Sequence, residues 1–311
     1  MNKVFIDGSA GTTGLRIKER LSSRADISLI VIPDELRKDE NARREALNSA
    51  DVAILCLPDE ASREAVSFIS NPETVVIDTS TAHRTSESFT YGFPEISGLK
   101  EKIKTSKRIA NPGCHASGFI SLVAPLVEKG IIPKDASLSA FSLTGYSGGG
   151  KKMISEYEAA DRPALYDAPR MYGTAQNHKH LPEMQKVCAL TAAPVFCPIV
   201  APYYSGMEVT VPLFRSAICG GIDDIKQAYK TYYSSGLVRF VDSEDGFISA
   251  GEYSGYDDME IAVFGNEERI LLVSRFDNLG KGASGSAIQN LNISLGLEES
   301  LGLNLKFGGN K

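Results

Sequence analysis

The first residues of the chain constrain its fold more strongly than any other stretch. Lys3 to Ile6 has the apolar character of a short strand, and Leu15 to Leu21 has the apolar spacing of a helix. Between them, Gly8, Gly11 and Gly14 recur at three-residue intervals. Glycines in such a loop permit a tight turn and let backbone N–H groups approach a pyrophosphate at the helix start. The strand, glycine loop and helix therefore predict a dinucleotide-binding unit.

The segment that follows alternates short apolar runs with helical sequence. Strands are expected at Ile27 to Ile32, Val52 to Leu57, Thr74 to Ile77 and Arg108 to Ala110, with a crossover helix over Ala61 to Ile69. Strands that alternate with helices indicate a parallel sheet, and the loops at their carboxyl ends line its crevice. We therefore expect an α/β, Rossmann-type domain.

The end of the second strand is where such a domain contacts the adenosine ribose. Asp34 lies there, and an acid at this point favours NAD, whereas Arg37 and Lys38 just beyond it could pair with the 2′-phosphate of NADP. We prefer NADP. The alternative is that these two residues, with Arg43 and Arg44, form the solvated face of a helix.

The stretch NPGCHASG, Asn111 to Gly118, places a cysteine between a proline-glycine turn and an apolar helix that ends near Gly130. Pro125 inside that helix predicts a kink. A thiol at a helix N-terminus faces backbone N–H groups and the positive end of the macrodipole, which favour the thiolate. Cys114 is therefore the candidate nucleophile, with an inert core cysteine as the alternative. We expect His115 to be a local turn residue.

Beyond this helix the pattern becomes strand-rich. Strands are expected at Ser137 to Leu143, Val195 to Val200, Met207 to Leu213, Met259 to Phe264 and Arg269 to Ser274, and a last helix at Ala283 to Leu295. We expect residues 1–113 and 283–311 to form the NADP-binding domain. Residues 114–282 should form an α+β, mostly antiparallel domain for catalysis and oligomerisation.

Composition narrows the function further. The 311 residues carry a net charge of −6 with no compensating basic run, which argues against a nucleic acid partner and favours a small-molecule substrate. The five cysteines form no CxxC pair, which suits a reducing compartment. The start MNKVFIDGSAG has no signal core, and no run approaches the ~18 apolar residues of a membrane span. We expect a cytoplasmic protein without a membrane partner.

Seven motifs together resemble one enzyme family. They are, in order, GSAGTTG, IDTSTAHR, YGFPEI, NPGCHASG, GYSGGGKK, HKHLPE and DNLGKGASGSAIQNLN. Over nearly the whole chain this order resembles N-acetyl-γ-glutamyl-phosphate reductase of arginine biosynthesis, in its shorter form, a relative of aspartate-semialdehyde dehydrogenase. The resemblance implies NADPH-dependent reduction of an acyl phosphate to an aldehyde through a cysteine thioester, in a homo-oligomer (a dimer or tetramer).

The resemblance also implies site residues. Cys114 matches the nucleophile, and His180 or His178 matches the acid/base; we prefer His180, with Glu183 as a supporting carboxylate. A metal pair is the rival interpretation of HxH, but no third ligand of suitable spacing is evident. The implied cofactor-binding residues are Gly8, Ser9, Gly11, Thr12, Thr13, Gly14, Pro58, Ser80 and Asn278. The implied substrate and phosphate residues are Asn111, Arg84, Ser147, Gly148, Lys151 and Lys152.

Two departures and two rival functions accompany this interpretation. The chain has NPGCHASG and SGGGKK where longer relatives resemble NPGCYPT and SGAGR, so Lys151 or Lys152 must supply the cation that an arginine gives elsewhere. Arg84 could equally be a buried structural ion pair. An enzyme like aspartate-semialdehyde dehydrogenase is the first rival, against which HKHLPE argues. A non-catalytic cofactor-binding redox sensor is the second, and the complete catalytic set argues against it.

Overall fold

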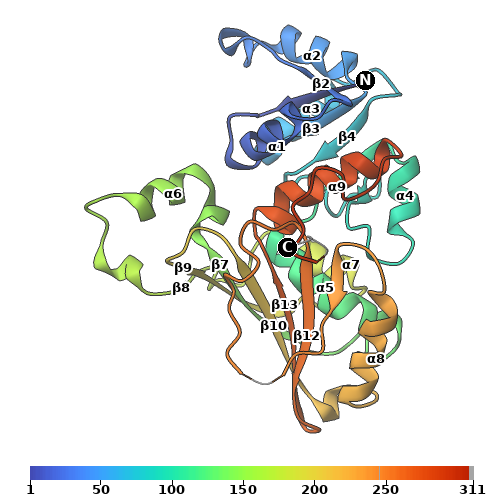
Figure 1. Ribbon diagram of the computed structural model, residues 1–311, viewed down its shortest axis with the longest axis vertical. Coiled ribbons are helices and arrows are strands. Elements are labelled where there is room, and N and C mark those ends of the chain that lie inside the picture. Colours follow the sequence, from blue (N-terminus) through green and yellow to red (C-terminus); the bar gives the residue numbers. More distant parts are fainter. Residues whose placement is uncertain (245, 308–311) are drawn as a thin grey trace. The chain divides into compact units, whose positions relative to one another are not determined.

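The chain leaves its first structural unit at Pro112 and re-enters it at Ala283 (Figure 1). The computed structural model describes residues 1–244 and 246–307. Unit 1 comprises Met1–Pro112 and Ala283–Leu303. Unit 2 comprises Gly113–Gly282 and the described residues from Asn304 onward.

Unit 1 is built on a parallel sheet. Within the described residues its six strands lie in the order β2-β1-β3-β4-β6-β5, and every pairing is parallel. The strands are β1 (Asn2–Asp7), β2 (Ile27–Ile30), β3 (Val52–Leu55), β4 (Val75–Asp78), β5 (Thr90–Tyr91) and β6 (Arg108–Ala110). The helices are α1 (Thr12–Ser22), η1 (Asp34–Leu36), α2 (Glu40–Ser49), α3 (Asp59–Ser67), α4 (Leu99–Thr105) and α9 (Gly285–Ser294). The Rossmann-type fold expected from the sequence is confirmed.

Alternate side chains of these strands build two separate cores. Val4 and Ile6 of β1 belong to one core together with side chains of α1, α4 and α9. Phe5 points to the opposite face and packs with side chains of α2 and α3. Burial on both faces explains why these strands have continuous apolar runs rather than alternating polarity.

Unit 2 is built on a mixed sheet in which antiparallel pairing is the commoner kind. In the part of the chain that is described, seven strands lie in the order β11-β12-β13-β10-β7-β9-β8. The strands are β7 (Ser139–Gly145), β8 (Arg170–Met171), β9 (Val195–Ala201), β10 (Met207–Phe214), β11 (Val238–Phe240), β12 (Met259–Gly265) and β13 (Arg269–Phe276). The helices are α5 (Cys114–Glu128), η2 (Tyr146–Gly149), α6 (Gly150–Glu158), η3 (Ala164–Asp167), α7 (Leu181–Val187), η4 (Arg215–Ala217) and α8 (Ile222–Tyr232). A π-helical segment, η5 (Gly280–Ser284), precedes α9.

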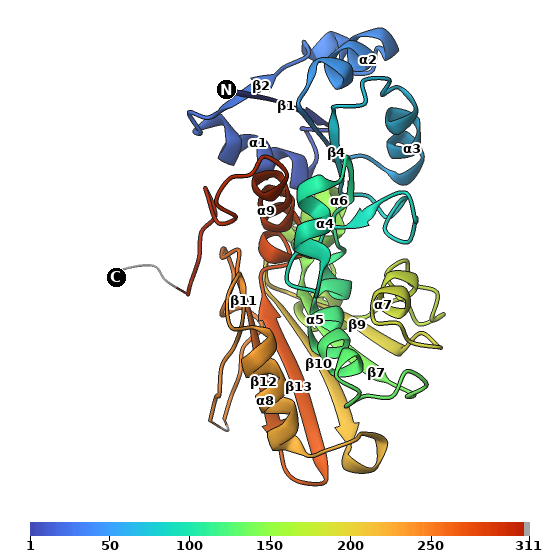
Figure 2. The ribbon, with the colours of Figure 1, turned by 90° about the vertical axis from the view of Figure 1, so that its right-hand side faces the viewer.

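The helix α5 packs against strands β10 and β13 of this sheet, and α8 packs against α5 (Figure 2). Gly118 makes the close approach possible, because a Cβ there would lie 2.4 Å from Val209 Cγ2. Pro125 lies inside α5 and has no N–H to give to Ser121 four residues earlier. The Ser121 carbonyl instead accepts the Tyr233 hydroxyl at 2.7 Å. Contacts with the sheet and α8 thus stabilise a helix that contains proline.

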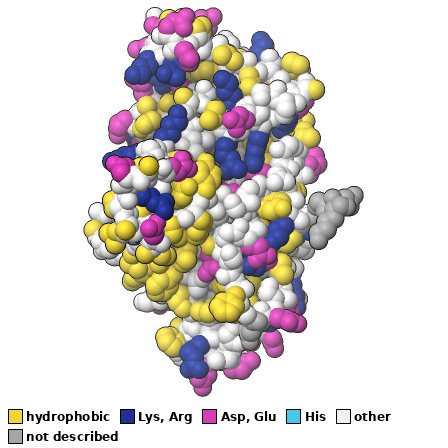
Figure 3. Space-filling view, turned by 60° about the vertical axis from the view of Figure 1, so that its left-hand side comes forward, with side chains coloured by type: hydrophobic (Ala, Val, Ile, Leu, Met, Phe, Trp, Pro, Cys, Tyr) yellow, Lys and Arg dark blue, Asp and Glu magenta, His cyan; other side chains and the backbone are white. Residues whose placement is uncertain are grey.

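The other face of the unit 2 sheet is open and apolar. Phe141, Phe214 and Leu271 are exposed there on three adjacent strands. The register of the strand pairs places these three side chains on the same face of the sheet. Figure 3 shows hydrophobic side chains gathered in the lower part of one face. An apolar sheet face of this kind is typical of a protein–protein contact.

The observed elements differ from the predicted ones in several places. The first helix begins at Thr12 rather than at Leu15. Helices α6 and α8 were not predicted, although Ile225, Ala228 and Tyr229 of α8 have helical spacing and are buried.

The chain end also differs. The described residues from Asn304 onward belong to unit 2 and not to unit 1. The reason is that buried carboxylates of unit 2 bind the backbone of this segment: Asp257 Oδ2 accepts from Asn304 N at 2.8 Å and Asp258 Oδ2 from Phe307 N at 2.6 Å.

Candidate active site

A pocket opens in unit 1 at the carboxyl ends of β1 and β3. The connections after these two adjacent strands run to opposite faces of the sheet, which is the place where open α/β sheets bind ligands. Its volume is about 490 Å³. The lining residues come mainly from the ends of β1, β2 and β3: Phe5 to Gly11, Lys18, Leu29 to Ile32, Asp34, Arg37, Lys38, Arg43, Cys56 to Pro58 and Ala61.

The glycine loop forms the floor of this pocket, and two of its glycines cannot be replaced without moving the backbone. Gly8 has a positive φ of 84°, and a Cβ there would lie 2.3 Å from the Cys56 carbonyl oxygen. A Cβ at Gly14 would lie 2.5 Å from the Gly8 oxygen. Gly11 donates its N–H to Gly8 O at 3.0 Å and caps α1. This compact loop leaves the helix start open to a ligand, so the unit fits the pyrophosphate of a dinucleotide.

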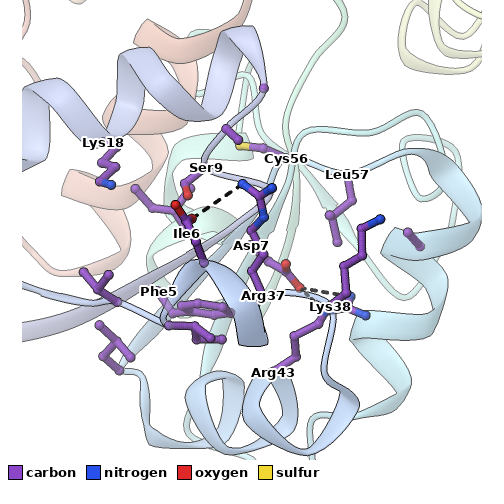
Figure 4. Close-up of a pocket in the computed structure, with 18 of the residues that line it drawn as sticks. Phe5, Ile6, Asp7, Ser9, Lys18, Arg37, Lys38, Arg43, Cys56 and Leu57 are labelled. Carbon is purple, nitrogen blue, oxygen red and sulfur yellow. Dashed lines mark hydrogen bonds and ion pairs between the residues drawn. The ribbon is translucent and has the colours of Figure 1, made fainter.

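Three basic side chains line the pocket in addition to Arg43. Lys18 comes from α1, whereas Arg37 and Lys38 come from the segment between β2 and α2 (Figure 4). Lys18 was missed in the sequence, although it lies on the helix that follows the glycine loop. Arg37 lies 3.6 Å from Asp34, and both side chains are largely exposed.

Arg43 is not part of a solvated helix face, and that alternative is wrong for this residue. It is only 9% exposed, because its guanidinium pairs with Asp7 at 3.0 Å and with Glu64 at 2.9 Å. Burial raises the pKa of Asp7, and the neighbouring Arg43 opposes that effect. The pair ties α2 to the end of β1 beside the pocket.

Three groups of predicted cofactor residues differ in their surroundings. Ser9 and Pro58 line the pocket. Thr12, Thr13 and Gly14 form the first turn of α1, just outside the lining. Ser80 is buried and donates to Asp78 Oδ2 at 2.8 Å.

Arg84 and Asn111 also belong to unit 1. Arg84 donates to the carbonyl oxygens of Asn111 at 2.9 Å and Thr79 at 3.0 Å, so it supports the chain just before the cysteine. The Asn111 amide donates to Ala283 O at 3.1 Å and accepts from Asn290 at 3.1 Å. Both predicted phosphate residues thus donate to backbone carbonyl oxygens of unit 1.

Cys114 is the first residue of α5 and is partly exposed. Its predecessor, Gly113, caps the helix and donates its N–H to Glu183 Oε2 at 3.2 Å. Gly282 passes close by, because a Cβ there would lie 2.9 Å from Cys114 Cβ. The candidate nucleophile therefore lies at a helix start, as the sequence predicted, between a buried carboxylate and a glycine-rich backbone.

Histidines and aromatic rings form a cluster in unit 2 next to this helix start. His178 and His180 have ring centroids 4.7 Å apart, and each lies within 5.6 Å of the His115 ring. His180 Nε2 lies 3.9 Å from Glu183 Oε1, and the backbone N–H of His180 donates to His178 Nδ1 at 3.2 Å. The structure thus brings both predicted histidines together with Glu183, the carboxylate that holds Gly113.

His115 is the member of this cluster that sequence reasoning misjudged. It is not a turn residue: it lies in α5, is 3% exposed, and bonds Ser142 Oγ and Tyr172 Oη at 2.7 Å each. Burial, and to a lesser extent the neighbouring His178, lowers its pKa to about 3. Its partners lie far away in the sequence, so no local pattern indicates them.

Two adjacent residues of unit 2, Asp277 and Asn278, join several of its loops. Asp277 Oδ1 accepts from Leu279 N at 2.7 Å, and Oδ2 accepts from the Ser205 hydroxyl at 3.1 Å. Asn278 donates to Ser147 Oγ and accepts from Gly206 N, both at 3.0 Å. Asn278 was predicted to bind cofactor, and in this structure it supports the loop that carries Ser147.

The remaining predicted phosphate residues lie on that loop and on α6. Gly148 is exposed, and a Cβ there would lie 3.4 Å from Asn278 Nδ2. Lys151 and Lys152 are exposed in the first turn of α6, with Lys152 Nζ 4.0 Å from Glu156. Of this set, the structure joins Ser147 to Asn278 and leaves the two lysines exposed to solvent.

The part of the chain that the structure describes has neither a metal-binding cluster nor a membrane-spanning helix. Over residues 1–244 and 246–307, no three His, Cys, Asp or Glu side chains are grouped in a way that could hold a metal ion. The helices of that same part of the chain are all too short or too polar to cross a membrane.

Two family models match the chain in succession. The NAD binding domain of semialdehyde dehydrogenase matches residues 3–106, and the dimerisation domain of semialdehyde dehydrogenase matches residues 114–278. The two matches meet between residues 106 and 114, close to the place where the chain passes from unit 1 to unit 2.

Curated relatives are similar over almost their full length. N-acetyl-γ-glutamyl-phosphate reductase 2 of Nostoc sp. is 44% identical, covering 97% of this chain and 99% of the relative. N-acetyl-γ-glutamyl-phosphate reductase of Burkholderia lata is 42% identical, covering 94% of this chain and 96% of the relative.

Solved structures share the fold at lower identity. Aspartate semialdehyde dehydrogenase II of Vibrio cholerae superposes with a TM-score of 0.71 at 16% identity, over 95% of this chain and 98% of that one. The aspartate semialdehyde dehydrogenase of Candida albicans with NADP has a TM-score of 0.65 at 15% identity, over 94% and 98% of the two chains.

Proposed function

Since the chain belongs to the N-acetyl-γ-glutamyl-phosphate reductase family, we propose that it reduces N-acetyl-γ-glutamyl phosphate with NADPH. The products are N-acetylglutamate semialdehyde and inorganic phosphate, and the reaction belongs to arginine biosynthesis. One observation carries the proposal: a cysteine at the start of α5 lies beside a carboxylate, Glu183, that also approaches a buried histidine, His180. A nucleophile, a base and a group that orients the base are the parts that acyl transfer requires.

Cys114 acts first, as the nucleophile. Its thiolate attacks the acyl carbon, the bond between that carbon and the phosphate oxygen breaks, and a thioester forms as phosphate leaves. The N–H groups of the first turn of α5 lie outside the intrahelical hydrogen bonds and are placed to bind the oxyanion of the tetrahedral state. In other acyl-transfer sites one such donor contributes roughly 3 to 4 kcal/mol.

His180 acts as the acid/base group. It takes the proton of the thiol before attack, and it returns that proton to the leaving sulfur as the anionic tetrahedral species collapses to the aldehyde. His180 is 5% exposed, and the Glu183 carboxylate near its Nε2 orients the ring. His178 accepts the backbone N–H of His180 through Nδ1, which suits a supporting role.

The pocket of unit 1 would hold the cofactor. A bound NADPH supplies the hydride that reduces the thioester. Gly8, Gly11 and Gly14 leave room for its pyrophosphate at the start of α1. Arg37 and Lys38 at the rim give two positive charges where a 2′-phosphate would lie, and this favours NADP over NAD.

The departing phosphate is assigned, within unit 2, to Ser147, Gly148 and one of the exposed lysines, Lys151 or Lys152; Asn111 and Arg84 of unit 1 stay candidates for phosphate binding from the sequence resemblance alone. A lysine holds phosphate as a point charge, without the two-pronged geometry of arginine. Both lysines are exposed on α6, which follows Ser147 and Gly148 directly.

The open face of the unit 2 sheet supports a homo-oligomer. Phe141, Val195, Phe214 and Leu271 are 41–67% exposed on it. A second copy of the chain can cover this face by sheet-to-sheet packing, and the matching family model is itself a dimerisation domain.

Steady-state kinetics tests the proposed function. Purified protein should oxidise NADPH in the presence of N-acetyl-γ-glutamyl phosphate, prefer NADPH to NADH, and run backwards with N-acetylglutamate semialdehyde and phosphate. Turnover of aspartate semialdehyde instead would transfer the assignment to the related enzyme. Turnover of neither would favour a binding protein.

Replacement of the nucleophile sharpens this test. Cys114→Ser should lose at least about 10³-fold in turnover and still bind NADPH, because a serine hydroxyl is a far poorer nucleophile than a thiolate. Cys219→Ser is the matched control, since Cys219 is exposed on the surface. If Cys114→Ser kept more than a tenth of wild-type turnover, Cys114 would not be the nucleophile.

A further inference from the structure

The first turns of α5 contain a buried hydroxyl that forms no hydrogen bond. Ser117 is 1% exposed. Among the described residues of α5, it is the one whose buried side-chain oxygen has no hydrogen-bond partner. A buried O–H without an acceptor is costly, so nearly all such groups in folded proteins are paired. The state of the Ser117 hydroxyl therefore needs a physical reason.

The next serine of the same helix shows the usual arrangement. A serine inside a helix commonly donates to a carbonyl oxygen of the preceding turn. Ser121 is fully buried, and its hydroxyl donates to Gly118 O at 2.8 Å. The carbonyl of Gly113 accepts the backbone N–H of Ser117 at 2.8 Å but not its hydroxyl. The two buried serines thus differ in their hydrogen bonding, and the unsatisfied one is the one nearer to Cys114.

The geometry of the helix places the Ser117 side chain beside the nucleophile. Ser117 lies three residues after Cys114, so the two side chains are neighbours on one face of α5, with Cβ atoms about 5 to 6 Å apart. The Cα–Cβ bonds of a helix tilt toward its N-terminus, so the Ser117 side chain leans toward the turn that begins at Cys114. The oxygen of an acyl group on the Cys114 sulfur can span the remaining distance.

Backbone N–H groups at the start of α5 are donors for the same oxygen. The hydrogen bond from Ser117 N to Gly113 O begins the helical ladder, so the N–H groups of His115 and Ala116 have no acceptor within the helix. Gly113 caps α5 without a side chain, so no cap oxygen takes these donors. Amide donors and the positive end of the macrodipole favour a negative oxygen at a helix start. The hydroxyl and the amides together fit an oxyanion.

We propose that Ser117 is a catalytic residue whose hydroxyl donates a hydrogen bond to the acyl oxygen while that oxygen is anionic. The oxygen becomes anionic when the Cys114 thiolate adds to the acyl carbon, and again when hydride adds to the thioester carbon. Serine keeps its proton in both states. The partner of the hydroxyl forms only during the reaction, which explains why the protein itself supplies none. The inference rests on the proposed function for the role of Cys114.

The test is the burst of p-nitrophenolate released by p-nitrophenyl acetate from the whole enzyme, with the signal of Cys114→Ser subtracted. This activated ester acylates the sulfur through a tetrahedral oxyanion and needs neither NADPH nor the proposed substrate. Ser117→Ala should slow the burst about 10²-fold, as the removal of an oxyanion donor does in other acyl-transfer sites. Ser121→Ala is the matched control and should follow wild type, because its hydroxyl is satisfied inside the helix.

Two further measurements separate this role from a structural one. Alkylation of Cys114 by iodoacetamide forms no oxyanion, so Ser117→Ala should be alkylated at the wild-type rate. The variant should also melt no lower than wild type, because it loses a hydroxyl without a partner and gains a better helix former. In turnover of N-acetyl-γ-glutamyl phosphate, kcat and kcat/KM should fall together, as expected for an interaction made only in the transition state.

Three results would overturn the inference. A Ser117→Ala burst within about threefold of wild type would remove the hydroxyl from the oxyanion site. Alkylation slowed as much as the burst would place the hydroxyl on the sulfur instead. A lowered melting temperature would show that Ser117 has a structural partner. If wild type does not turn over N-acetyl-γ-glutamyl phosphate and the Ser117→Ala burst is still slowed, the proposed function alone fails.

Discussion

His178 and His180 differ in their surroundings although they are only two residues apart. His180 caps α7, is buried, and lies near Glu183, whereas His178 is less buried and accepts a backbone N–H. A ring that must gain and lose protons is better served by a carboxylate neighbour than by a fixed backbone donor. We therefore assign the proton transfers to His180.

His180→Asn should lower turnover by about 10² to 10⁴-fold and remove one limb of the pH profile, because general acid–base catalysis typically contributes that much. His178→Asn should mainly raise the Michaelis constant. The measurement is the pH dependence of kcat and kcat/KM for both variants. Small, equal losses would exclude both rings from proton transfer.

His115 also makes stability depend on pH. The pKa of His115 is about 3 in the folded protein, whereas an ordinary histidine, as in the unfolded chain, has a pKa of 6.5. Between these two pH values the unfolded chain binds a proton on this residue that the folded protein does not bind. The stability that the neutral ring contributes is complete above 6.5 and is lost as the pH falls toward 3. From pH 7 to pH 5 the loss from this group is about 2 kcal/mol.

Urea unfolding at pH 7 and pH 5 checks that value. Wild type should lose about 2 kcal/mol more of its unfolding free energy than His115→Leu/Ser142→Ala, which has no ring to protonate. Titration of the other histidines is common to both proteins and cancels in the comparison. Equal losses would mean that the ring is protonated in the native protein at pH 5.

The helix α5 depends on a residue without a side chain at its contact with the sheet. Gly118→Ala should destabilise the protein by about 1 to 3 kcal/mol, because the new methyl group would lie 2.4 Å from Val209 Cγ2 and 2.9 Å from Ser274 Oγ. Gly251→Ala is the control, since a Cβ there meets only Ser249 Oγ at 3.6 Å. Thermal unfolding should separate the two variants by several degrees. A Gly118→Ala melting temperature equal to that of the control would show that α5 can move away from the sheet.

The open sheet face determines the assembly that we expect of the whole protein. Phe141 and Leu271 lie on this face on strands β7 and β13, to either side of β10. Wild type should elute in gel filtration well above the 33.5 kDa of one chain. Phe141→Glu/Leu271→Glu should elute as a monomer, because burying two uncompensated carboxylates in an interface is costly. Elution of wild type as a monomer would contradict the oligomer.

Local patterns were sufficient for the framework of the protein. Three features depend only on residues that are close in sequence: the strand, glycine loop and helix at the start of the chain, the alternation of strands with helices, and the cysteine at the start of α5. Such patterns follow from the side-chain periodicity of strands and helices and from the backbone freedom of glycine. They can therefore be recognised without knowledge of tertiary contacts. The order of the motifs likewise identified the family.

Tertiary packing decided which polar side chains are buried and what they contact. Arg43 resembles any basic residue of a surface helix until Asp7, 36 residues earlier, is placed against it. His115 resembles a turn residue until Tyr172, 57 residues later, meets its ring. Asn304 joins unit 2 because the Asp257 carboxylate accepts its N–H. The free energy of a buried polar group depends on whether a partner satisfies it, and that partner is chosen by the fold rather than by neighbours in the sequence.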